Sequence, residues 1–89
     1  MSTLDMYTPL KTKELKHGDR VVFVNDHRIK TQAYNLGRNN PLVGTKYETV
    51  GTVISIGVGC EVRWDNGEKN GYTDGDLALF NLPKMMIPI

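Results

Sequence analysis

The residues best able to do chemistry lie in one long polar stretch, residues 25–46, which we call the long loop. Cationic side chains there could hold a phosphate backbone, asparagine amides could reach base edges, and a tyrosine could stack on a base. The same composition also fits an ordinary solvated loop whose tyrosine packs locally, and both interpretations stay open. The candidate binding residues are Arg28, Lys30, Tyr34, Arg38, Asn39 and Lys46.

Catalytic and metal-binding patterns find little support elsewhere in the chain. A nucleophile needs an activating base or a strained turn, and neither Ser55 nor Cys60 stands in such a motif. His17 and His27 have no tight partner ligand, so they do not predict a zinc site. Asp74-Gly75-Asp76 begins like a calcium loop, but apolar residues follow where oxygen ligands should continue. We therefore expect a protein that is not an enzyme and has no cofactor or metal.

The segments that must position these residues have the composition of an all-β domain. β-Branched and aromatic residues form five short runs, separated by Gly, Asn and Asp. Gly51, inside the second run, indicates a bulge or a bend. A short helical turn is expected around residues 74–77, where Asp can cap and Gly permits unusual dihedrals. The expected strands are residues 21–24, 47–56, 60–64, 68–73 and 77–80.

The strongest hairpin signal is Asp65-Asn66-Gly67. A two-residue turn would point Tyr72 away from the face that carries Trp64. A three-residue loop with a left-handed Gly67 would instead place Tyr72 opposite Cys60, on the same face as Trp64. We favour the three-residue loop, because it gives Gly67 the positive φ and gathers the large apolar side chains. Trp64 and Tyr72 are then expected in the core, and a ligand-facing role for them is the alternative.

Four segments together resemble the small SH3-like barrels, above all the Tudor, chromo-like and KOW branches. These segments are HGDRVVF, VGTVISIG, EVRWDNGEKNGYTDGDL and LALF. The resemblance implies a five-stranded, strongly bent antiparallel barrel, with the long first loop and the central hairpin lining the binding surface. Such barrels bind RNA, DNA or proteins, so the resemblance implies binding rather than one activity. It divides the chain into a lead-in at 1–18, a barrel at 19–82 and an apolar tail at 83–89.

Composition narrows the class of protein further. The 89 residues suffice for one small domain, and the formal net charge of +1 excludes a strongly polycationic or polyanionic chain. Residues 1–46 carry eight Lys or Arg against four acids, and residues 47–89 carry three against six, which predicts two faces of opposite sign.

The single cysteine, Cys60, excludes an intramolecular disulfide and favours a cytoplasmic setting. No apolar run approaches the ~20 residues that span a bilayer, so no membrane partner is expected.

Two hypotheses for function follow. The favoured one is a non-catalytic, nucleic-acid-binding accessory or regulatory protein that contacts DNA or RNA through the candidate binding residues. The alternative is an adaptor or inhibitor that docks on a larger protein through the barrel loops and the apolar tail. The tail could also cover the open end of the barrel, or bring about weak self-association.

Overall fold

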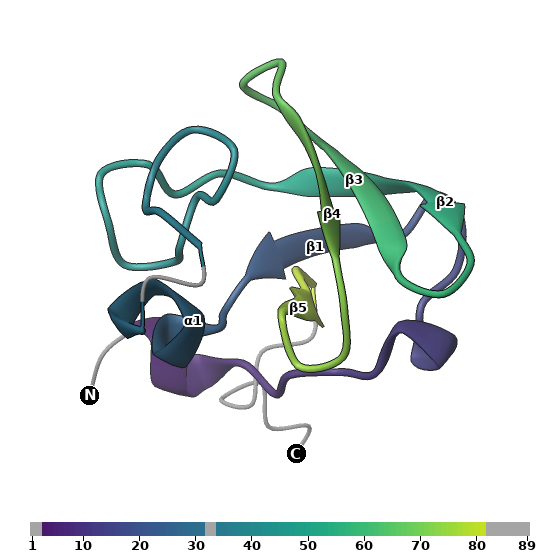
Figure 1. The fold of residues 1–89 in the computed structure, drawn as a ribbon, viewed down its shortest axis with the longest axis horizontal. Helices are drawn as coiled ribbons and strands as arrows, with labels where there is room; N and C mark the ends of the chain where they lie inside the picture. The colour runs from purple at the N-terminus through teal and green to yellow at the C-terminus, as the bar shows by residue number, and fades with distance from the viewer. Residues whose placement is uncertain (1–2, 32–33, 82–89) are drawn as a thin grey trace.

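The computed structural model describes residues 3–31 and 34–81 (Figure 1). Its main element is one antiparallel sheet of five strands in the order β4-β3-β2-β1-β5, so the expected all-β class is confirmed. The sheet is not closed, because β4 and β5 lie at its two edges. The elements are η1 (Thr3–Met6), η2 (Thr12–Glu14), β1 (Arg20–Phe23), α1 (Asp26–Lys30), β2 (Gly51–Ile56), β3 (Cys60–Trp64), β4 (Lys69–Tyr72) and β5 (Leu77–Leu79).

The second strand differs most from its expected bounds. It begins at Gly51, and residues 47–50 extend the connection from β1 instead. The register irregularity lies between Val53 and Ser55 rather than at Gly51, where the pattern predicted a bulge or a bend. Gly51 has another role: a Cβ there would lie 2.5 Å from both Trp64 Cε3 and Val62 Cγ1. Only glycine lets β2 approach the indole ring so closely.

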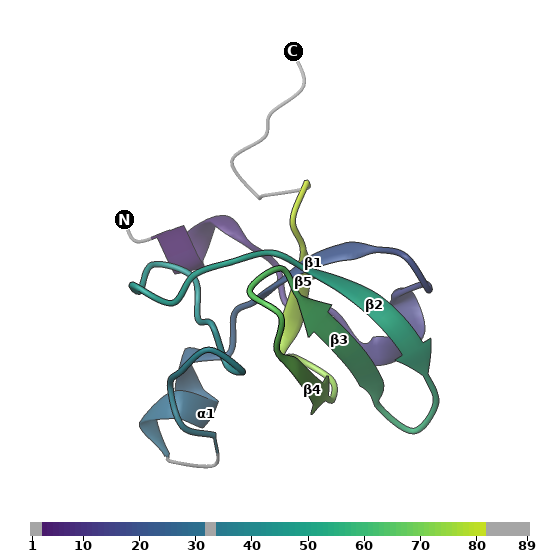
Figure 2. The same ribbon diagram turned by 90° about the horizontal axis from the view of Figure 1, so that it is seen from above.

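The helical residues fall in a different place from the one expected. Residues 74–76 form a turn with a positive φ of 87° at Gly75, so the helical turn predicted before the last strand is absent there. A short helix, α1, lies instead at the start of the long loop. The Asn25 side chain caps it by accepting a hydrogen bond of 3.1 Å from the backbone N–H of Arg28. Figure 2 shows α1 and the long loop to one side of the sheet.

The β3–β4 hairpin has the expected register. Cys60 lies opposite Tyr72, and Gly67 has a positive φ of 97° in a three-residue loop. Trp64 and Tyr72 are buried in the main core cluster, together with Phe23. The expected core role of both aromatic residues is therefore confirmed.

The described part of the lead-in packs against the rest of the domain. Leu15 is buried in the main core, and Leu10 pairs with Leu77 at the outer edge of β5. The Thr12 backbone N–H donates a hydrogen bond of 2.8 Å to Asp74 Oδ1. The lead-in thus covers one edge of the sheet, which protects it from pairing with another chain (Figure 1). The apolar tail predicted at 83–89 lies outside the described residues.

Candidate functional site

A buried carboxylate fixes the start of the long loop to the sheet. Asp76, in the turn before β5, is fully buried and accepts hydrogen bonds from Asn25 Nδ2 at 2.8 Å and from the Thr73 backbone N–H at 2.9 Å. The Tyr34 hydroxyl donates a longer bond of 3.4 Å, and Arg28 Nε completes an ion pair at 3.4 Å. A buried charge needs such partners, so this network holds α1 in place.

Two of the six candidate residues, Arg28 and Tyr34, therefore make contacts inside the domain. The Arg28 guanidinium lies 5.0 Å from the centre of the Tyr34 ring. The centre of the Tyr34 ring lies 6.0 Å from the centre of the Phe23 ring and 5.9 Å from that of Tyr72. Of the two roles considered for Tyr34, local packing is therefore the one that the structure shows. No sequence signal pointed to Asp76, because an aspartate beside a glycine in a turn is normally solvated.

Two other candidate residues meet at a hollow of about 330 Å³, which we call the basic hollow. Arg38 Nη2 donates a hydrogen bond of 2.6 Å to the Asn66 carbonyl, and Asn66 Nδ2 donates one of 2.7 Å to the Arg38 carbonyl. This reciprocal pair ties the long loop to the tip of the hairpin. The hollow is lined by Arg38, Lys46, Tyr47, Glu48, Thr49 and Asn66.

Tyr47 is a residue that the sequence analysis missed. The apolar pattern placed it in the second strand, but it lies in the connection before β2 and is half-buried. The Lys46 ammonium lies 5.2 Å from the centre of its ring. Glu48 is the acidic residue of this hollow, and its carboxylate accepts a hydrogen bond of 2.6 Å from the Gly44 N–H. The basic hollow thus combines two cations, an aromatic ring and one carboxylate that already has a partner.

The last two candidate residues do not line the basic hollow. Lys30 forms an ion pair of 2.7 Å with Asp26 on the exposed face of α1. Asn39 has an exposed side chain, while its carbonyl accepts hydrogen bonds from the Tyr72 hydroxyl and from Asn70 Nδ2. The structure therefore brings together Arg38 and Lys46, rather than the whole predicted set.

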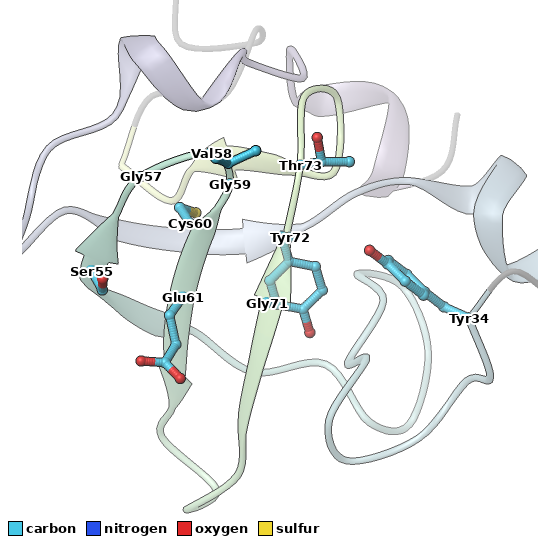
Figure 3. Close-up of a pocket in the computed structure, with 10 residues that line it drawn as sticks. All are labelled: Tyr34, Ser55, Gly57, Val58, Gly59, Cys60, Glu61, Gly71, Tyr72 and Thr73. Carbon is cyan, nitrogen blue, oxygen red and sulfur yellow. The ribbon is translucent and has the colours of Figure 1, made fainter.

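A larger hollow of about 470 Å³ lies beside the other end of the hairpin, and we call it the aromatic hollow (Figure 3). Its lining includes Tyr34 from the long loop, Val58 and Gly59 from the β2–β3 turn, Glu61 from β3 and Tyr72 from β4. The two tyrosine rings meet edge to face at 85°. No pattern in the sequence indicated this site, because its residues come from four separate segments.

Comparisons of the chain with protein-family models, curated proteins and solved structures find no match. Function is therefore inferred from the geometry of the two hollows.

Cys60 lines the aromatic hollow, but burial raises the pKa of its thiol, whereas a nucleophilic cysteine needs a lowered one. Within residues 3–31 and 34–81, no cluster of three or more His, Cys, Asp or Glu side chains could hold a metal ion. No helix in the same residues is long and apolar enough to cross a membrane.

Ion pairs join the basic first half of the chain to the acidic second half. Arg20 contacts Asp65 with an Nη1–Oδ1 distance of 2.9 Å, and Arg28 contacts Asp76. Because these charges neutralise each other, the cationic surface is smaller than the number of Lys and Arg residues in the first half of the chain implies. Arg38 and Lys46 form no ion pair within the described part of the chain, which leaves their charges available to a ligand.

Proposed function

We propose that this protein is a non-catalytic nucleic-acid-binding module, and that its contact surface is the basic hollow. The observation that carries the proposal is the meeting of Arg38, Lys46 and Tyr47 around one opening. Cations beside an aromatic ring are the elements that hold single-stranded nucleic acid, since the cations bind phosphates and the ring stacks on bases. The reciprocal hydrogen bonds between Arg38 and Asn66 support the proposal, because a cationic side chain that is already held in place loses less entropy on binding.

The proposed interaction is weak and depends on salt. Each phosphate that Arg38 or Lys46 neutralises releases counterions, so each contact adds about 0.7 to the slope of log affinity against log salt for a single strand. Two such contacts supply only modest steering, and we expect a dissociation constant of about 10⁻⁴ to 10⁻⁶ M.

The test is a titration of fluorescently labelled single-stranded DNA, single-stranded RNA and duplex DNA with the whole chain, read by anisotropy at about 50 mM salt. We expect Arg38→Ala and Lys46→Ala each to weaken binding, and each to reduce the magnitude of the slope of log affinity against log salt by about 0.7. Arg63→Ala is the matched control, because it removes an equal charge from the exposed face of β3. Absence of any complex at this salt concentration, or an equal loss in the control, would overturn the proposal.

We also propose that the sheet belongs to an SH3-like barrel and that the protein works in the cytoplasm. The antiparallel sheet, the long connection between β1 and β2 and the tight β3–β4 hairpin support the first proposal. The lone, buried Cys60 supports the second. The basic hollow also lies where the long loop meets the central hairpin, as the resemblance leads one to expect.

A further inference from the structure

The floor of the aromatic hollow is held rigidly. The hydroxyl of Tyr72 accepts a hydrogen bond of 3.0 Å from Trp64 Nε1, which fixes the ring. The β2–β3 turn lies against the same residue, because a Cβ on Gly59 would be 2.5 Å from the Tyr72 carbonyl oxygen. A surface whose side chains are already held in place loses little entropy on binding.

The charged residue in the lining of this hollow has the opposite sign to the cations of the basic hollow. Glu61 lies in its lining, and the fully buried Asp76 lies behind Tyr34. Asp76 is paired with Arg28 and the two charges neutralise each other, so Glu61 gives the lining of this hollow its net negative charge. This hollow therefore repels phosphate and favours a cationic side chain.

Apolar side chains stand beside the hollow. Val58, in the lining, is fully exposed in the β2–β3 turn, and Ile56 at the end of β2 is also exposed. Flanking glycines leave the Val58 side chain without neighbours from its own turn. Apolar groups gathered next to a concave surface are typical of a contact with another protein.

We propose that the aromatic hollow docks an extended segment of a partner protein that carries a Lys or Arg beside an apolar residue. The basic side chain meets Glu61, and the apolar side chain covers Val58. This contact is separate from the nucleic-acid proposal, since the two hollows lie at opposite ends of the β3–β4 hairpin. A protein with both surfaces would bring its partner to a nucleic acid.

The test uses the whole chain as bait for a phage-displayed library of short random peptides, followed by calorimetric titration of one enriched synthetic peptide. We expect enrichment of peptides with Lys or Arg next to an apolar residue. Val58→Ser should weaken binding about tenfold, through lost apolar burial. Glu61→Gln should weaken it about two- to fivefold, the range of a surface ion pair.

Two controls make the outcome decisive. Val58→Leu keeps the apolar surface and should bind as the unchanged protein does, and Arg38→Ala removes a cation only from the basic hollow. Absence of enrichment, enrichment of acidic peptides, or binding that both Val58→Ser and Glu61→Gln leave unchanged would overturn the proposal. So would loss of peptide binding in Arg38→Ala, or displacement of the peptide by a single-stranded oligonucleotide, because either result assigns the peptide to the basic hollow.

Discussion

Trp64 Nε1 donates a hydrogen bond of 3.0 Å to the hydroxyl oxygen of Tyr72, and the two buried rings meet nearly edge to face at 76°. The same hydroxyl can donate to the Asn39 carbonyl or to Asn40 Oδ1, 3.0 Å from it, in the long loop. One oxygen atom therefore links the β3–β4 hairpin to the loop that carries Arg38. The position of the basic hollow depends on this link.

Tyr72→Phe should lower the free energy of unfolding by about 1–3 kcal/mol, because it leaves buried hydrogen-bonding groups of Trp64 and the long loop without partners. Urea denaturation followed by tryptophan fluorescence measures the change. Tyr34→Phe is the matched control, since it removes only a 3.4 Å bond from a half-buried ring and should cost less. Equal stability of Tyr72→Phe and the unchanged protein would contradict the role given to this hydroxyl.

Gly51→Ala should destabilise the fold by about 1–3 kcal/mol, as expected for an overpacked core. The added methyl group would lie 2.5 Å from Trp64 Cε3, so either β2 or the indole ring must move. Gly57→Ala provides the control, because a Cβ at that position meets nothing within 4 Å. Thermal unfolding of both variants measures the difference, and similar melting temperatures would show that the packing around Gly51 is looser than described.

Asp76→Asn should cost about 3 kcal/mol, because it breaks a buried ion pair and replaces an acceptor oxygen with a donor. The loss of stability should be greatest near the substitution. Amide hydrogen exchange in α1 should therefore speed up more than exchange in β3. Asp26→Asn removes the partner of the exposed Lys30 on the same helix and should change stability little. Equal exchange rates in α1 of Asp76→Asn and the unchanged protein would show that Asp76 does not anchor the long loop.

Acid should weaken the contact between Arg20 and Asp65. The hydrogen bond from Arg20 holds the pKa of Asp65 below its ordinary value of 3.8. Because the folded state lowers this pKa, the stabilisation is present above about pH 4 and is lost as the pH falls through the folded value. Chemical denaturation across this range should show a steeper acid loss in the unchanged protein than in Asp65→Asn. Parallel curves would contradict the prediction.

Tyr47→Ala should weaken binding of single-stranded nucleic acid by about 1–3 kcal/mol, the contribution of one base stacked on an aromatic ring. Duplex binding should change little, since paired bases cannot reach the ring. Tyr47→Phe keeps the stacking surface and should bind single strands as the unchanged protein does. Anisotropy titrations of the three proteins measure these differences, and equal loss in the Phe and Ala variants would rule out stacking.

The local pattern was enough to predict the all-β class and the register of the β3–β4 hairpin. Alternation in Cys60–Trp64 and the glycine at position 67 act over a few residues, and backbone geometry leaves few ways to satisfy both. Gly51 was predicted to mark a bulge or a bend, but the pattern along the strand did not show why the position needs glycine. Its neighbour is the Trp64 ring on the next strand, and a pattern along one strand does not report that contact.

The sequence by itself determined how many charges the chain carries, which segments favour strands and where the tight hairpin turns. Only the tertiary structure decided which charges remain available. It pairs Arg28 with the buried Asp76, turns Tyr34 onto Phe23, and leaves Arg38 and Lys46 beside Tyr47. The physical reason is that strand and turn preferences act between neighbours in the chain, whereas burial and ion pairing act between segments that only packing brings together.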